Sequence, residues 1–82
     1  MTPRSEILDQ ISAIAADALD WHGELREESR LIDDLGLDSL RALTLVVEVE
    51  NRLRLRLTPD DEAGLVTVGD LLDAIERRAQ EG

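Results

Sequence analysis

Residues 34–40 have the sequence DLGLDSL, where a segment without regular periodicity ends and a strongly amphipathic helix begins. Apolar residues recur at helical spacing from Ser39 onward, so we expect a helix over residues 39–53. Ser39 then stands at the N-terminus of this helix, where free backbone amides point outward and favour a phosphate group. The serine has no neighbouring base and no G-x-S-x-G turn around it. The sequence therefore predicts a serine that carries a phosphate or phosphodiester, and not a nucleophile that attacks substrates.

This helix has two apolar faces. Its core face is formed by Ala42, Leu45, Val46, Val49 and Leu53. A second strip, spaced i, i+3 and i+7, consists of Leu40, Leu43 and Val47. Small helical domains bury wide faces, so this strip either belongs to the core or binds a partner. We expect a partner surface, because the helix carries more apolar area than its core face requires.

A first helix is expected ahead of this one. Thr2 is a suitable N-cap, and Pro3 at the first helical position sacrifices no hydrogen bond. The apolar period then continues to about Leu19 or Asp20. The long connection over residues 20–38 has no sustained period, and we expect its own apolar residues to anchor it in the core. These residues are Leu25, Leu31, Ile32, Leu35 and Leu37.

Two more helices follow. Thr58 and Pro59 repeat the opening pattern and predict a short helix over about 59–64. Thr67 and Asp70 have the spacing of a capping box, and a clear helical stripe follows them. Residues 53–57 alternate like a strand, but no partner strand exists elsewhere in the sequence. The predicted fold is therefore all-α: a four-helix bundle with three longer helices and one short third helix, packed antiparallel.

Composition excludes several classes of function. Nineteen acidic residues against nine arginines give a net charge of −10, which disfavours nucleic acid. There is no cysteine and His22 is the only histidine, so we expect no disulfide and no metal site. The longest purely apolar run, the four residues 13–16, is far too short to span a membrane. We expect a single free-standing domain over residues 1–82, monomeric and cytoplasmic, without a pocket of catalytic side chains.

The motif Asp38-Ser39-Leu40, preceded by residues 34–36, resembles the modification site of acyl carrier proteins. The resemblance covers nearly the whole chain and implies their four-helix fold. It implies that a phosphopantetheinyl transferase, using magnesium, attaches 4′-phosphopantetheine from coenzyme A to Ser39. Asp38 would belong to the motif that the transferase binds. The cofactor's thiol would carry acyl groups as thioesters, so the protein would be a carrier and not an enzyme.

The resemblance also implies partners that dock on the second helix: a ketosynthase, an acyltransferase or other loading and tailoring enzymes. The residues expected to contact them are Leu40, Arg41, Leu43, Thr44, Val47 and Glu48. The sequence departs from the family here, because Arg41 and Thr44 stand where many members carry acids. We therefore expect a dedicated partner set, as in polyketide or other specialised biosynthesis, and not a housekeeping role in fatty acid biosynthesis. The arginines at 52, 54 and 56 are expected to form a solvated face.

Growing acyl chains are expected to slip between the second and third helices, along Val46, Val49, Leu65 and Val66. Two alternatives remain open. A discrete peptidyl or aminoacyl carrier would share the fold and the cofactor. A small helical interaction module would have no prosthetic group and would use Leu40, Leu43 and Val47 to bind a partner helix.

Overall fold

The computed structural model describes the backbone of residues 3–81 and the side chains of residues 3–79. It contains four helices: α1 (Arg4–Leu19), α2 (Ser39–Leu53), α3 (Pro59–Ala63) and α4 (Val68–Glu81). Within residues 3–81 there is no strand, and one isolated bridge pairs Arg30 with Thr67. The all-α prediction with one short third helix is confirmed, and so is the rejection of a strand at residues 53–57.

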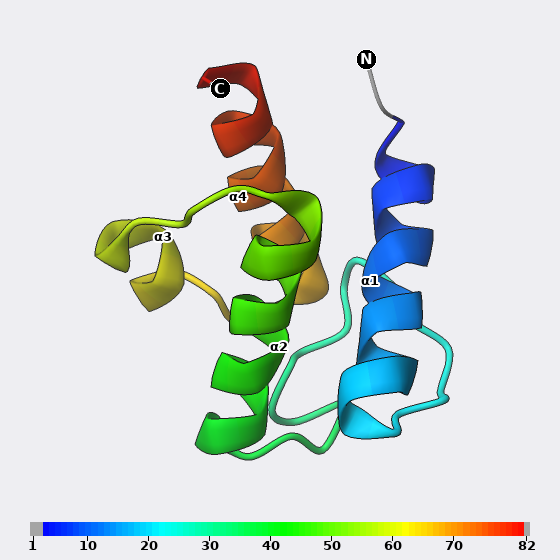
Figure 1. Ribbon diagram of the computed structural model, residues 1–82. Coiled ribbons are helices and arrows are strands. Elements are labelled where there is room, and N and C mark those ends of the chain that lie inside the picture. The colour runs from blue at the N-terminus through cyan, green and yellow to red at the C-terminus, as the bar shows by residue number, and fades with distance from the viewer. Residues whose placement is uncertain (1–2, 82) are drawn as a thin grey trace.

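Figure 1 shows how the three longer helices lie side by side, with α3 set off to one side of α2. α1 runs antiparallel to both α2 and α4, as expected. However, α2 and α4 run in the same direction, so the prediction of antiparallel packing is wrong for that pair. The connection that contains α3 carries the chain back along the bundle before α4 begins, and this return makes the parallel pair possible.

One hydrophobic core joins the three longer helices and the long loop. Six large side chains are almost completely buried in it: Ile11, Leu45, Val49, Val68, Leu71 and Leu72. Burying a side chain of this size contributes roughly 1.5–3 kcal/mol each. The core face predicted for α2 is confirmed for Leu45, Val46 and Val49, whereas its two end residues are half-buried.

The start of α1 differs from the prediction. Pro3 has an extended ψ of 148° and is therefore the N-cap, so the first helical residue is Arg4. The Pro3 carbonyl accepts hydrogen bonds from the N–H groups of Glu6 and Ile7, and no side chain caps this end. Thr2, the predicted cap, lies outside the described residues. The other end matches: α1 stops at Leu19.

The loop before α2 is anchored as predicted, with one exception. Leu25, Leu31, Leu35 and Leu37 are buried, but Ile32 is 52% exposed. The reason is local geometry. Residues 30–36 form tight turns in which the N–H groups of Asp34 and Leu35 bond to the Arg30 carbonyl. Leu31 and Leu35 consequently point inward, one helical turn apart, while Ile32 points outward. Trp21 packs beside them, and its indole N–H donates to the Leu35 carbonyl at 3.0 Å.

A buried carboxylate holds the short helix α3 in place. Asp61 is 7% exposed and forms a capping box with Thr58, in which each side chain accepts a hydrogen bond from the other residue's N–H. Its carboxylate also accepts hydrogen bonds from Arg77 and Arg78 of α4, both at 2.8 Å. These two arginines and the amide of Thr58 lower the pKa of Asp61 well below its ordinary range. Asp61 therefore ties a five-residue helix to α4.

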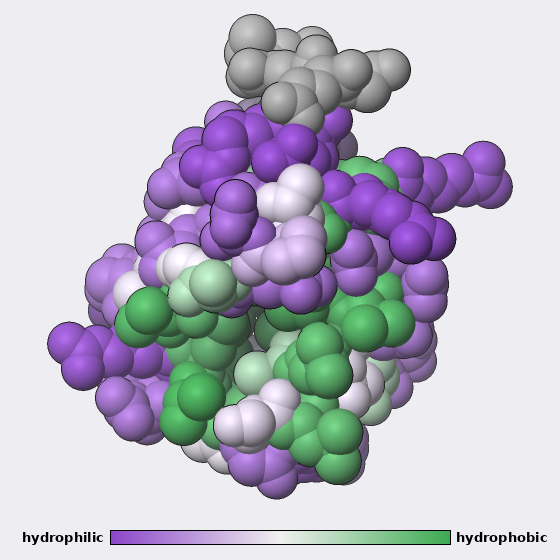
Figure 2. Space-filling model, turned by 90° about the vertical axis from the view of Figure 1, so that its left-hand side faces the viewer, coloured by the Kyte–Doolittle hydropathy of each residue, from purple (hydrophilic) through white to green (hydrophobic). Residues whose placement is uncertain are grey.

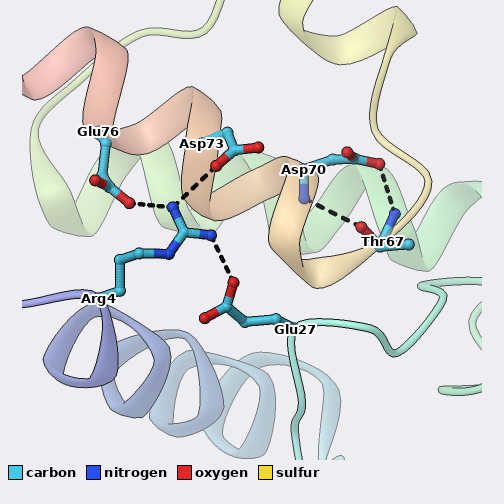
Figure 3. A network of polar contacts seen from close by, with 6 residues as sticks. All are labelled: Arg4, Glu27, Thr67, Asp70, Asp73 and Glu76. Carbon is cyan, nitrogen blue, oxygen red and sulfur yellow. Dashed lines mark hydrogen bonds and ion pairs between the residues drawn. The ribbon is translucent and has the colours of Figure 1, made fainter.

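A second polar network joins α1 and α4 to the loop before α2 (Figure 3). The Arg4 guanidinium bonds to Glu27 of the loop at 2.6 Å and to Asp73 and Glu76 of α4, the first of these at 2.9 Å. Figure 3 also shows the predicted capping box of α4, in which Thr67 and Asp70 exchange hydrogen bonds at 3.0 and 3.1 Å. That prediction is confirmed.

Replacing Asp61 by asparagine removes the charge that faces Arg77 and Arg78, and we expect the thermal midpoint to fall by at least about 5 °C. The lowered pKa of Asp61 determines how its contribution to stability depends on pH. Because the folded pKa lies below the ordinary value of 3.8, the contribution is complete above that pH and disappears as the pH falls below it. Thermal unfolding followed between pH 7 and about pH 2 measures both effects.

The matched control is Asp60→Asn, in the same first turn but exposed. An equal loss in the two variants, or a difference between them that is as large at the acid end as at pH 7, would contradict the role assigned to Asp61.

Candidate functional site

The N-terminus of α2 is capped by Asp38. Its carboxylate accepts a hydrogen bond from the N–H of Arg41 at 2.8 Å, and its carbonyl accepts from Ala42 at 2.9 Å. Asp38 has extended backbone angles, φ −85° and ψ 177°, as an N-cap residue requires. Ser39 is therefore the first helical residue. Ser39 is not the helix cap, because Asp38 already occupies that position.

Ser39 is exposed at this helix end. Its hydroxyl makes no hydrogen bond with any residue of the described range. The backbone N–H groups of Ser39 and Leu40 likewise find no partner there, as the first amides of a helix do not. Free amides and the positive end of the helix dipole stabilise an oxygen-linked phosphate at this position. The local geometry suits a serine modified by a phosphodiester.

The loop before α2 fixes the position of Ser39 from its N-terminal side. Gly36 has φ +74°, in the left-handed region that favours glycine, and allows the chain to turn between two buried leucines. Leu35 and Leu37 are 7% and 3% exposed, so both flanks of this glycine are held in the core. Asp38 and Ser39 follow directly. The serine thus projects from a rigid junction between an anchored loop and a well-packed helix.

An apolar cavity of about 440 Å³ opens beside Ser39, between α2, α3 and the loop. Three of the four residues predicted to contact an acyl chain border it: Val46, Leu65 and Val66. The fourth, Val49, is completely buried and lies outside the cavity lining. Figure 2 shows hydrophobic side chains gathered around a hollow on this side of the molecule. The cavity therefore places an apolar space next to Ser39.

Among the lining residues that were not predicted are two exposed apolar ones, Ile32 and Leu43. Both stand at the border of the cavity, each 52% exposed. The signal for Ile32 was present in the sequence, because Leu31 and Leu35 are spaced one helical turn apart and leave Ile32 facing out.

The second apolar strip of α2 lies outside the core. Leu40, Leu43 and Val47 are 72%, 52% and 41% exposed. Exposed large apolar side chains gathered on one helix face are typical of a surface that meets another molecule.

The polar residues predicted beside the strip differ in their surroundings. The Arg41 guanidinium is exposed and donates to the Leu19 carbonyl at 3.3 Å, so it contacts no carboxylate. The Thr44 hydroxyl donates to the Leu40 carbonyl at 2.9 Å, within the helix. Glu48 is half-buried and pairs with Arg52 at 3.1 Å. Of these three, Arg41 has the charge most available to a partner.

In the described part of the chain, no group of histidine, cysteine, aspartate and glutamate side chains is arranged to hold a metal ion. Among the same residues, no helix is both long enough and apolar enough to cross a membrane.

Comparison with known proteins agrees with this geometry. The family model described as "Phosphopantetheine attachment site" matches residues 9–75. The acyl carrier protein of Thermotoga maritima is 34% identical over 79 residues, which cover 95% of this chain and 98% of that protein. The acyl carrier protein of Clostridium perfringens is 34% identical over 76 residues, covering 92% and 100%. The meromycolate extension acyl carrier protein of Mycobacterium leprae is 30% identical over 94% of this chain and 62% of that protein.

The fold is also that of a solved structure. The crystal structure of an acyl carrier protein from Thermotoga maritima superimposes with a TM-score of 0.86 at 24% identity, covering 95% of this chain and 92% of the other. The class defined by fold and site is thus a phosphopantetheine-dependent carrier. The chain belongs to the acyl carrier protein family. It is a carrier rather than an enzyme, and its cofactor is 4′-phosphopantetheine.

Proposed function

We propose that Ser39 is the attachment point of the cofactor. The observation that carries this proposal is that two neighbouring residues have separate roles at the start of α2. Asp38 caps the helix, which leaves the Ser39 hydroxyl exposed and without a hydrogen bond among the described residues. In the attachment reaction Ser39 Oγ forms a bond to phosphorus, and the bond from that phosphorus to the adenosine bisphosphate part of coenzyme A breaks. The hydroxyl proton passes to the transferase.

The residues around Ser39 fit a phosphodiester. The free amides of Ser39 and Leu40 face the phosphate position, and the carboxylate of Asp38 is turned back toward the N–H of Arg41. When bound, the cofactor supplies a thiol that holds an acyl group as a thioester. The chain itself contributes a rigid origin for the arm and a surface that partner enzymes recognise.

Partner enzymes dock, in this proposal, on the exposed side of α2. The surface consists of Leu40, Arg41, Leu43, Thr44, Val47 and Glu48. The exposure of its three large apolar residues supports this assignment, since the core is complete without them. The transferase, a ketosynthase, an acyltransferase and tailoring enzymes would use this surface in turn. One monomeric carrier domain over residues 1–82 suffices for that role.

The pathway is proposed to be polyketide or other specialised biosynthesis. Residues 39–59 contain four arginines against Glu48 and Glu50, a local charge of +2 in a chain of −10. A basic docking surface on the carrier excludes partner enzymes whose own docking surface is basic, because like charges placed opposite one another cost binding energy. A cytoplasmic location belongs to the same proposal, because the thiol of the cofactor must stay reduced.

The apolar cavity is proposed to shelter the acyl chain. Its volume of about 440 Å³ lies within the usual range for small-molecule pockets, roughly 300–1,000 Å³. Ser39 stands on its border, so an arm that starts there can fold back into it. Val46, Leu65 and Val66 would contact the chain, with Val49 packed in the core and not in the lining.

Incubation with a broad-specificity phosphopantetheinyl transferase, magnesium and coenzyme A tests the attachment site. We expect the intact mass to rise by one phosphopantetheine in the parent and in Ser5→Ala, and to stay unchanged in Ser39→Ala. Ser5 is the matched control, because it is also exposed in the first turn of a helix. A gain that survives Ser39→Ala would place the arm on another residue, and no gain with several transferases would leave the unmodified interaction module as the better hypothesis.

The shelter for the acyl chain is tested by NMR on the loaded protein. Replacing the free thiol by an octanoyl thioester should shift the amide and methyl signals of Val46, Leu65 and Val66. The signals of Ile11, in the core of α1 and away from the cavity, should move far less. Unchanged signals at all three valine and leucine positions would show that the chain stays in solvent.

A further inference from the structure

A second hollow, of about 570 Å³, lies where α2 ends and the connection to α3 begins. Its character differs from that of the cavity beside Ser39, because charged and polar side chains form most of its border. The residues around it are Val47, Glu50, Asn51, Arg54, Leu55 and Arg56. Val47 belongs both to this hollow and to the exposed apolar strip of α2, so the two surfaces are continuous.

The arginines of the hollow form no ion pair within the described residues. Six of the nine arginines form ion pairs: Arg4, Arg26, Arg30, Arg52, Arg77 and Arg78. Arg54 and Arg56 are exposed, and neither makes an ion pair or a side-chain hydrogen bond with the described residues. The contrast with Arg52 is direct, because Arg52 bonds to Asp17 at 2.6 Å and to Glu48 at 3.1 Å.

The acid nearest to these arginines in the hollow is already engaged. The Glu50 carboxylate accepts a hydrogen bond from the N–H of Leu57 at 2.9 Å. Arg41, the third arginine without an ion pair, lies at the other end of the apolar strip, next to Leu40. Among the described residues, the arginines that lack a carboxylate partner thus all lie in residues 39–59, on α2 and the connection after it. They flank the exposed leucines and valine at both ends.

We infer that this surface docks a partner enzyme whose entrance is acidic. The surface, called here the arginine-flanked strip, consists of Leu40, Leu43 and Val47 with Arg41, Arg54 and Arg56. The inference rests on the proposed function, since it takes α2 to be the docking face of a carrier. In this inference an arginine-bearing face of the carrier meets an acidic face of the enzyme, although the chain as a whole has a net charge of −10.

Charge complementarity selects this occupant. Carboxylates on a partner are repelled by a chain of net charge −10, except where unpaired guanidinium groups attract them. A guanidinium group binds a carboxylate through two parallel hydrogen bonds, which fixes orientation as well as position. Because Arg54 and Arg56 have no internal ion pair, none has to break when the partner binds. Nucleic acid is a poor occupant, because the rest of the surface repels a phosphate backbone.

The test compares two variants of equal net charge. Arg54→Gln combined with Arg56→Gln, and Arg26→Glu alone, each take the chain from −10 to −12. Arg26 is exposed on the loop and pairs with Glu24, away from the strip. Each protein is first loaded with phosphopantetheine and an acetyl group. Its kcat/KM as acyl donor is then measured with two ketosynthases, one with an acidic entrance and one with a basic entrance.

With the acidic ketosynthase we expect the double variant to lose about tenfold in kcat/KM, and Arg26→Glu to lose less than about twofold. The difference should shrink as salt rises from about 0.05 to 0.5 M, because screening weakens the contact. With the basic ketosynthase the double variant should lose nothing. Equal losses in the two variants, or a loss by the double variant on both enzymes, would overturn the inference.

A further variant separates this inference from the proposed function. Leu40→Asp places a charge in the apolar strip without touching the cavity, and should lower kcat/KM with both ketosynthases. If Leu40→Asp has no effect on either enzyme, or the parent is not loaded at all, the proposed function fails and the inference falls with it. If Leu40→Asp acts as expected and the arginine variants do not, the inference alone fails. A parent dimer that dissociates in the double variant would assign the strip to a second copy of this chain.

Discussion

The hydrogen bond from the Arg41 N–H to the Asp38 carboxylate fixes where α2 begins, and the exposure of the Ser39 hydroxyl depends on this start. An N-cap side chain satisfies one of the amides that a helix leaves free at its start, and only one residue can occupy that position. Since Asp38 occupies it, Ser39 becomes the first helical residue, with its hydroxyl exposed. The backbone amides of Ser39 and Leu40 remain free at the same end of the helix. The arrangement that stabilises the helix is therefore also the one that leaves the serine open to modification.

Burial of one face of α2 decides what the rest of the helix can do. Leu45 and Val49 are completely buried, so rotation of α2 about its axis would expose both and cost several kcal/mol, at roughly 1.5–3 kcal/mol each. That fixed rotation keeps Leu40, Leu43 and Val47 on the outside and turns Val46 toward the apolar cavity. α3, held to α4 through Asp61, forms the opposite side of that cavity. The apolar cavity and the exposed apolar strip of α2 thus both follow from how one helix packs.

Local patterns predicted the helices and their caps well, because each cap depends on residues a few positions apart. Thr67 with Asp70 and Thr58 before Pro59 are examples. The position of Ser39 at the start of α2 was predicted for the same reason, whereas Val46, Leu65 and Val66 were expected at a cavity from the apolar faces beside a short third helix. Long-range features were not predictable in this way: the contact of Asp61 with Arg77 and Arg78 joins segments 16 and 17 residues apart. The parallel course of α2 and α4 likewise depends on packing between segments.

The separate roles of Asp38 as the helix cap and Ser39 as an exposed, unbonded residue are tested most directly by the free energy of unfolding of two variants. This quantity is measured by urea denaturation. Removing the cap with Asp38→Ala should destabilise the protein by about 1 kcal/mol, within a usual range of about 0.5–2. Ser39→Ala should change the stability by less than about 0.5 kcal/mol, because the exposed hydroxyl makes no contact that the fold requires. A loss in Ser39→Ala as large as that in Asp38→Ala would contradict the account, since it would make Ser39 a structural residue and not a free one.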